Sequence, residues 1–357
     1  GLNSFRLGQS RSAVEDLERS LHIYKELKET GSIPMLLAET AMIRATIGDV
    51  ELAKKLYQEA LVWLREEKNL FTEADTLNNL SVLYLQLGEY ELASDTFEQG
   101  LVAAHKSRNQ HAESLILTGL GDLYTEIEEH DAALQAYERA ETVAGEAIGA
   151  FLSNYLILAR ANLAILKKDA QSASQYLRQF KRKLKLNPSV YERGFWSLLE
   201  GRRNFLIDEY GKAVQLLKEG KSCFLQDGRE SEYQWCLIWL MAAYEQSGNR
   251  QNACVEFREL LPVKNKTNHS LIIALYQASP WLVPLQSDGE IGRELGGLLQ
   301  KSQQLSAKLS SVRRILRRHA QSIQMPAPIL KVRALGRGER QLEPAGARRR
   351  RPGPLGR

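Results

Sequence analysis

The histidines, cysteines and glycines of this sequence do not have the spacing of a catalytic or metal-binding motif. The sequence holds no glycine-rich phosphate loop, no serine nucleophile elbow and no His-Glu-x-x-His helix. Cys223, Cys236 and Cys254 lack the paired spacing of a metal site, which predicts reduced thiols and a cytoplasmic protein. The six histidines are scattered: His22, His105, His111, His130, His269 and His319. We therefore expect a protein that is not an enzyme and that uses no metal or cofactor.

A pattern with a period of 40 residues runs along most of the chain. It is counted from seven pivot residues: Gly8, Gly48, Gly88, Glu128, Lys168, Asp208 and Gly248. Five residues after each pivot stands an alanine, and four residues further on a large apolar residue: Leu17, Tyr57, Phe97, Tyr137, Leu177, Leu217 and Phe257. Seven residues before six of the pivots, the residue is small except for Met241: Ala41, Ser81, Gly121, Ala161 and Gly201. A fixed period of this size indicates a stack of identical supersecondary units.

Residues 73–105 show what one unit folds into. Leu77, Leu80 and Tyr84 recur at intervals of three and four, which predicts one face of a helix. Gly88 ends that helix, and a second helix with Phe97 facing inward follows after a short link. The unit is therefore an antiparallel helical hairpin. One hairpin cannot bury both of its faces, so the units must stack into an all-α solenoid.

The order of small residue, pivot, alanine and aromatic resembles the tetratricopeptide repeat. Residues 88–93 with Phe97 and Gly100, and residues 48–53 with Tyr57, are similar to its consensus. The usual period of that family is about 34 residues, and here it is 40. The resemblance covers residues 1–262 as seven repeats. It implies a right-handed superhelix of antiparallel hairpins, and a fold that hosts many different partners.

The same resemblance implies that the first helices of successive hairpins line a concave surface. Three rows of residues face it, counted six, ten and thirteen positions before each pivot. These rows supply the candidate binding residues, which are either polar or aromatic: Asn78, Asp122, Tyr155, Asn162, Phe195, Arg202 and Trp235. We expect them to bind a protein segment or a small effector, with Arg202 holding a carboxylate or phosphate. Two plainer interpretations stay open: the aromatics pack between neighbouring helices, and the polar row is ordinary solvated surface.

Charge divides the chain into two parts. Residues 301–357 hold 15 basic and 2 acidic side chains, a net charge of +13, whereas the other 300 residues hold 33 basic and 41 acidic ones, a net charge of −8. The basic end predicts weak contact with nucleic acid or another acidic surface. No apolar run is long enough to span a membrane.

The C-terminal part has three predicted segments. Residues 263–325 should form helices that cap the solenoid, over 269–277 and 290–323, with Pro280 and Pro284 breaking the chain between them. Residues 326–357 begin with a linker and a strand-like stretch, 329–336, and end in an Arg/Pro/Gly-rich segment that should be disordered. The stretch 329–336 resembles the opening strand of the winged-helix output domain in transcriptional regulators of the antibiotic regulatory protein (SARP) type.

These features favour one function over two alternatives. The preferred hypothesis is the regulatory or sensor region of a multidomain transcriptional activator, similar to the sensor solenoid of bacterial maltose-type activators. A stand-alone scaffold that binds partner peptides is the main alternative, and an interaction domain attached to an enzyme is the other. Residues 1–7 look like the last turns of a helix, so we expect a piece of a longer protein.

Overall fold

A computed structural model describes residues 10–27, 29–145, 149–183, 189–261, 269–287, 289 and 291–322, and the side chains of these residues except 10–12 and 317–322. All regular structure in this part of the chain is helical, as the repeat predicts. Through residue 261 the helices are α2 (Ser10–Glu26), η1 (Thr30–Ser32), α3 (Ile33–Thr46), α4 (Val50–Glu66), α5 (Leu70–Gln86), α6 (Tyr90–Ser107), α7 (Gln110–Glu126), α8 (His130–Ala144), α9 (Ala150–Leu166), α10 (Ala170–Lys183), α11 (Val190–Leu206), α12 (Tyr210–Asp227), α13 (Glu230–Gln246) and α14 (Arg250–Leu260).

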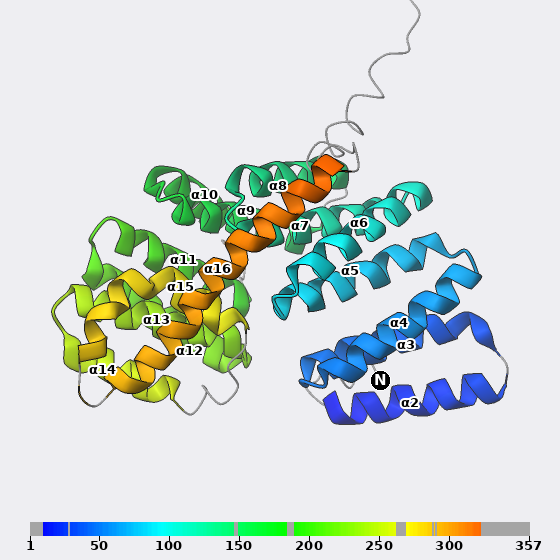
Figure 1. The fold of residues 1–357 in the computed structure, drawn as a ribbon, viewed down its shortest axis with the longest axis horizontal. Helices are drawn as coiled ribbons and strands as arrows, with labels where there is room; N and C mark the ends of the chain where they lie inside the picture. Colours follow the sequence, from blue (N-terminus) through cyan, green and yellow to red (C-terminus); the bar gives the residue numbers. More distant parts are fainter. Residues whose placement is uncertain are drawn as a thin grey trace, which may run out of the picture.

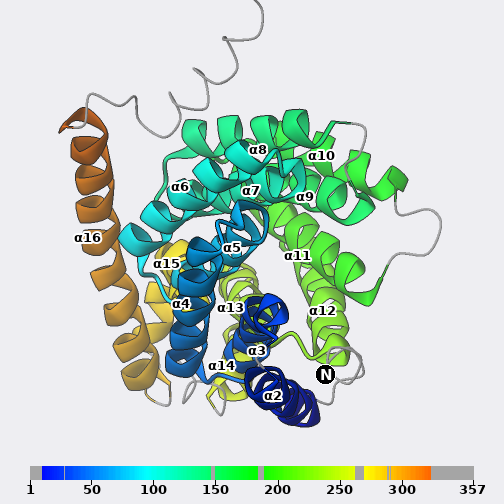
Figure 2. The same ribbon diagram turned by 90° about the vertical axis from the view of Figure 1, so that its right-hand side faces the viewer.

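The helices pair into antiparallel hairpins around the pivots. We number the hairpins in pivot order, so that α3–α4 around Gly48 form hairpin 2 and α13–α14 around Gly248 form hairpin 7. The first helix of hairpin 1 was expected in residues that lie outside the described part. The hairpins stack side by side into a curved solenoid, and α6 to α12 follow an arch in Figure 2. Figure 1 shows the same stack from the side.

Each pivot from Gly48 onward adopts the left-handed backbone conformation that ends a helix. The φ angle is 90° at Gly48, 69° at Gly88, 62° at Glu128 and 74° at Gly248, and it is equally positive at Lys168 and Asp208. At Gly88 the backbone N–H bonds to Leu85 O at 2.9 Å, and the next N–H bonds to Tyr84 O at 2.9 Å. This double hydrogen bond satisfies carbonyls that the helix end would otherwise leave unpaired. The first helix of each hairpin therefore ends at the pivot, and these helix ends recur every 40 residues.

The residues of the repeat pattern form the core between the hairpins. The alanine five positions after each pivot is 0% exposed in all seven units, and the large residue four positions later is at most 5% exposed. The small residue and the large residue of one hairpin touch. A Cβ added to Gly121 would lie 2.3 Å from Tyr137 Cε1, and one added to Gly201 would lie 2.8 Å from Leu217 Cγ. A small residue is therefore required at this position, because the large side chain fills the space beside it.

The stack continues past residue 262 as a further hairpin. Helix α15 (His269–Leu282) packs against α13, and η5 (Val283–Ser287) links it to the long helix α16 (Gly292–Ser322). Pro280 does not break the chain as expected, because it lies inside α15. Proline has no N–H for the carbonyl of Tyr276, and the hydroxyl of Ser279 bonds to that carbonyl at 3.0 Å instead. We call α15–α16 hairpin 8. The segment 326–357, with its predicted strand and basic end, lies outside the described residues.

Hairpin 8 also contacts hairpins 3 and 4, so the superhelix closes on itself. Helix α16 crosses the stack diagonally in Figure 1 and lies beside α6. Its residues Leu305, Leu309 and Val312 are buried in the apolar cluster that holds α5, α6 and α7 together. Polar contacts surround this cluster, and they join Lys308 Nζ to Gly88 O (2.7 Å), Arg313 Nη1 to Glu128 Oε2 (2.6 Å), Tyr276 OH to Glu128 Oε1 (2.7 Å) and His269 Nε2 to Tyr90 OH (2.8 Å). We call this set the closing contact.

The carboxylate of Glu128 joins both helices of hairpin 8, and its removal should weaken the fold. Glu128→Gly relieves the strain of a left-handed non-glycine residue but loses the bonds to Tyr276 and Arg313. Lys168→Gly is the matched control, because Lys168 has nearly the same φ of 58° at the next pivot. We expect Glu128→Gly to be less stable than Lys168→Gly by about 1–3 kcal/mol in urea unfolding. Equal stability of the two variants would show that the bonds of the Glu128 carboxylate to Tyr276 and Arg313 add nothing.

Candidate functional site

The predicted binding residues all lie on the first helices of their hairpins, and the structure gathers most of them into two clusters. Asp122 of α7 and Tyr155 of α9 form one cluster, and Asn162, Arg202 and Trp235 of α9, α11 and α13 form the other. Two residues stand apart from both clusters. Asn78 on α5 donates a hydrogen bond to Asn79, and Phe195 on α11 stacks on Tyr191 at 5.8 Å between ring centres.

Two tyrosine hydroxyls hold the carboxylate of Asp122. Tyr137 OH donates to Asp122 Oδ1 at 2.7 Å, and Tyr155 OH donates to Oδ2 at 2.8 Å. Thr125 Oγ1 lies 3.1 Å from Tyr137 OH and completes the network. Burial raises the pKa of Asp122 to about 7, against the two hydrogen bonds, which lower it. The sequence pattern assigned Tyr137 only to packing, although its hydroxyl reaches the inner face.

Arg202 is the centre of the second cluster and is 1% exposed. Its Nη1 donates to Asn162 Oδ1 at 2.7 Å, and its Nη2 donates to Gln277 Oε1 of α15 at 3.0 Å. The guanidinium carbon lies 4.7 Å from the ring centre of Trp239 and 5.4 Å from that of Trp235. Such contacts stabilise a cation that burial has stripped of water. Gln277 and Trp239 were not among the predicted residues, and Gln277 is conspicuous only as a polar residue in an apolar helix.

Helix α15 therefore covers part of the inner face. Besides the Arg202 bond, its Ser270 Oγ accepts a hydrogen bond from Trp235 Nε1 at 2.8 Å. Met35 of α3, at the other end of the inner rows, is 50% exposed, whereas Asn78 is half-buried, as Asn162 and Trp235 are. Oδ1 of Asn78 is shielded from solvent and has no hydrogen-bond partner among the described residues. The inner face thus has a covered half at α9–α13 and an open half at α3–α7.

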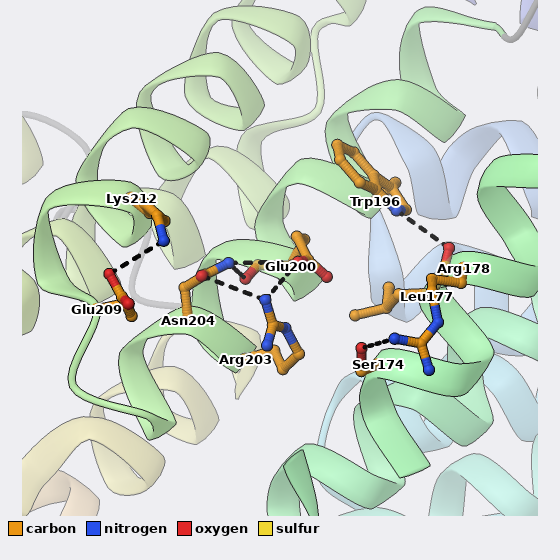
Figure 3. A network of polar contacts seen from close by, with 9 residues as sticks. All are labelled: Ser174, Leu177, Arg178, Trp196, Glu200, Arg203, Asn204, Glu209 and Lys212. Atoms are coloured by element: carbon orange, nitrogen blue, oxygen red, sulfur yellow. Dashed lines mark hydrogen bonds and ion pairs between the residues drawn. The ribbon is translucent and has the colours of Figure 1, made fainter. Parts of the chain in front are cut away.

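A second polar network lies between α10, α11 and α12, away from these two clusters (Figure 3). Arg203 Nη2 bonds to Glu200 Oε1 at 2.7 Å and to Asn204 Oδ1 at 3.2 Å. The indole N–H of Trp196 donates to Leu177 O at 3.3 Å. The contacts of Arg203 lie within α11, whereas the bond of Trp196 joins α11 to α10.

Several site types can be tested within the described part of the chain. No group of three or more His, Cys, Asp or Glu side chains there is arranged to hold a metal ion. Cys223, Cys236 and Cys254 are buried, and burial raises the pKa of the Cys236 thiol well above its usual value. Across the described helices, none combines the length and the apolar character that crossing a membrane requires.

Comparison with known proteins gives one family. The tetratricopeptide-repeat family matches twice, at residues 32–106 and 72–146, which cover hairpins 2 to 4. A crystal structure of a tetratricopeptide repeat protein from Parabacteroides merdae is similar with a TM-score of 0.44 and 16% identity, over 76% of this chain and 100% of that one. No curated protein matches the chain. The family match and the hairpin stack together support a solenoid of tetratricopeptide repeats.

Proposed function

We propose that this chain is a protein-interaction scaffold whose inner face binds a partner segment or a small effector. Tetratricopeptide repeats generally bind protein partners, and hairpins 2 to 4, which match the family, are the ones whose inner face is open. The observation that carries the proposal is Asn78, whose Oδ1 is shielded from water and has no hydrogen-bond partner in the described structure. A buried acceptor of this kind costs stability unless a partner supplies a donor. The backbone N–H of an extended segment is such a donor.

The open half also supplies apolar surface and carboxylates. Met35 is half exposed, and Met42 and Val82 are partly buried along the same inner rows. Burial raises the pKa of Asp75, and hydrogen bonding to Asn109 opposes that rise. A partner segment that brings apolar side chains together with backbone donors would satisfy this surface.

Site-specific crosslinking tests the proposal. A photoreactive phenylalanine analogue placed at Met35 should capture the same partner repeatedly from cells that contain it. Val62, which is 56% exposed on the second helix α4, is the matched outer position and should capture no such partner. Asn78→Ala should abolish the Met35 product without changing the circular dichroism spectrum. Equal capture from Met35 and Val62, or no effect of Asn78→Ala, would contradict the inner-face assignment.

The finer proposal is that the scaffold is the regulatory region of a multidomain transcriptional activator in the cytoplasm. Its support is the resemblance of residues 329–336 to an output-domain strand. The basic segment after residue 330 supports weak nucleic-acid contact, which should fall steeply as salt rises because phosphate neutralisation releases counterions. The complete reading frame decides this point: a nucleotide-binding switch domain upstream favours the activator, and its absence favours the stand-alone adaptor. Binding rather than catalysis is proposed in either case.

A further inference from the structure

Hairpin 5 differs in charge from the rest of the solenoid. Residues 147–191 hold 8 basic side chains and 1 acidic side chain, a net charge of +7. The other residues up to position 300 hold 25 basic and 40 acidic ones, a net charge of −15. Half of the basic residues of hairpin 5 lie on its second helix, α10, which contains no acidic residue: Arg178, Lys181, Arg182 and Lys183.

The other second helices of hairpins 2 to 7 do not have this composition. Helices α4, α6, α8, α12 and α14 each contain two or three acidic residues. The helix dipole favours cations in a last turn, but Arg65 at the end of α4 also pairs with Glu73 at 2.9 Å. Helix α16 is basic too, but its cations are spread over 31 residues, and Lys308 and Arg313 bond to hairpins 3 and 4. The dipole alone therefore does not account for the composition of α10.

Packing fixes which side of α10 faces solvent. Ala173, Leu177 and Phe180 are at most 1% exposed and lie along one face of the helix. The exposed residues of α10 are all glutamine, arginine or lysine: Gln171, Gln175, Arg178, Gln179, Lys181, Arg182 and Lys183. We call these seven residues the α10 face. It is held rigidly by the apolar contacts behind it and is polar over its whole length.

The cations of the α10 face are oriented by uncharged groups. Arg178 Nη1 donates to Ser174 Oγ of the same helix at 2.9 Å (Figure 3). Lys183 Nζ donates to Ser153 Oγ of α9 at 2.7 Å, and Lys181 Nζ lies 4.7 Å from the centre of an indole ring on α11. Within the described part of the chain, no carboxylate pairs with the four cations of this face. Their positive charge is therefore available to an external anion.

The composition of the α10 face favours one class of acidic partner. A lipid surface is bound through apolar side chains that enter the headgroup region, and single-stranded nucleic acid through aromatic rings on which bases stack. The α10 face exposes neither kind of side chain. Proteins that bind RNA duplexes contact two successive minor grooves, which exceeds the length of about 21 Å of a 14-residue helix. Arginine, lysine and glutamine are side chains that contact the phosphate and sugar oxygens of duplex DNA.

We propose that the α10 face binds the phosphate backbone of double-stranded DNA. The site lies on a second helix, so it goes beyond the proposed function and does not rest on the inner face being a binding surface. It is also separate from the basic segment after residue 330. Contacts to phosphate carry no sequence information, so the site binds DNA of any sequence.

Fluorescence anisotropy of a labelled DNA duplex of mixed sequence, titrated with the full chain, tests the proposal. The variant is Arg178→Gln combined with Arg182→Gln, in a helix that already exposes three glutamines. We expect its Kd to be about 10-fold higher than that of the wild type at about 100 mM salt. The slope of log Kd against log salt should fall by about 1–2, because two phosphate contacts are lost.

The matched control is Lys55→Gln combined with Lys106→Gln. These two lysines are exposed on α4 and α6, and their replacement removes the same two charges from the chain. We expect this double variant to change the Kd by less than about 2-fold, because charges far from the bound phosphates are screened by salt. An unchanged Kd in the α10 variant, or an equal loss in both variants, would overturn the proposal. Binding would then reside in the basic segment after residue 330 or in net charge.

A gain of affinity provides a second test that does not depend on removing a residue. Gln175→Arg combined with Gln179→Arg adds two cations to the α10 face, and arginine and glutamine have similar helix propensities. We expect the Kd to fall about 10-fold and the salt slope to steepen. Unchanged affinity in this variant, with an unchanged circular dichroism spectrum, would contradict a phosphate site on α10.

Further probes distinguish DNA from other acidic partners. Vesicles of phosphatidylglycerol represent a membrane, and a polyglutamate peptide represents an acidic protein. Loss of vesicle or peptide binding in the Arg178/Arg182 variant, with DNA binding retained, would overturn the proposal in favour of that partner. Tighter binding of a single strand or of an RNA duplex than of the DNA duplex would overturn it as well. None of these results bears on crosslinking from Met35, so the two proposals fail separately.

Discussion

Replacing Gly121 with valine should destabilise the protein by about 3 kcal/mol, because the new side chain must enter space that Tyr137 fills. A Cβ at Gly121 would lie 2.3 Å from Cε1 and 2.5 Å from Cδ1 of that ring. The ring cannot easily retreat, since its hydroxyl bonds to Asp122 and contacts Thr125. Urea unfolding followed by circular dichroism measures the loss.

Gly297 is the matched control for this substitution. It is an exposed glycine inside helix α16, and a Cβ added there meets no other heavy atom within 4 Å. Gly297→Val should therefore be neutral or slightly stabilising, because valine has a somewhat higher helix propensity than glycine. If both variants lost the same free energy, a general intolerance of valine in these helices would explain the result, and the contact with Tyr137 would not.

The hairpin stack can be predicted from the sequence because the features that produce it are local, or join residues a fixed number of positions apart. A helix stop depends on one residue in the left-handed region, and the pivots from Gly48 to Gly248 all adopt it. The fit of Tyr137 against Gly121 involves residues only 16 positions apart, and the same fit recurs between Gly201 and Leu217, so it leaves a visible period. The links opposite the pivots use the same device, at Lys68, Arg108 and Gly228.

The contacts that close the superhelix could not be predicted in this way. The bond between Arg202 and Gln277 joins hairpins 6 and 8, and that between Tyr276 and Glu128 joins hairpins 8 and 4. Such pairings depend on how far the stack curves over several repeats. This curvature is the sum of small rotations between neighbouring hairpins, and no single residue in the sequence indicates it. Arg202 and Asn162 were therefore identified as inner-face residues, but the helix that covers them was not.

Asp122 should make the stability of the protein depend on pH, in the direction opposite to an ordinary paired carboxylate. Its pKa is raised from 3.8 to about 7, mainly by desolvation. Between pH 4 and pH 7 the folded state therefore keeps a proton that the unfolded chain has released. Proton binding then favours the folded state at the acidic end, so stability falls as pH rises through this window and levels off above pH 7. The full difference amounts to at most about 4 kcal/mol, from 1.36 kcal/mol per pKa unit.

The variant Asp122→Asn isolates this effect, because asparagine resembles the protonated acid and does not titrate. Its stability relative to the wild type should rise by up to about 4 kcal/mol between pH 4 and pH 8, as the wild-type carboxyl loses its proton. Asp169→Asn is the control with the opposite sign. Asp169 caps α10 through Ser172, and hydrogen bonding to Ser172 lowers the pKa of that exposed carboxyl. The difference for Asp169→Asn should therefore stay nearly constant from pH 8 to pH 4 and become less unfavourable only as the pH falls below 3.8, the ordinary pKa of that carboxyl.

Urea titrations of both variants and the wild type at pH 4, 5, 6, 7 and 8 give the difference curves directly. A flat curve for Asp122→Asn would mean that Asp122 is ionised in the folded state throughout this range. The two tyrosine hydroxyls would then compensate fully for its burial, and the Asp122–Tyr137–Tyr155 cluster would be an anionic feature of the inner face at every pH tested. A curve that rises as expected makes the same cluster neutral below pH 7. A basic partner group would then have to displace the proton in order to bind there, so its affinity would increase with pH over the same window.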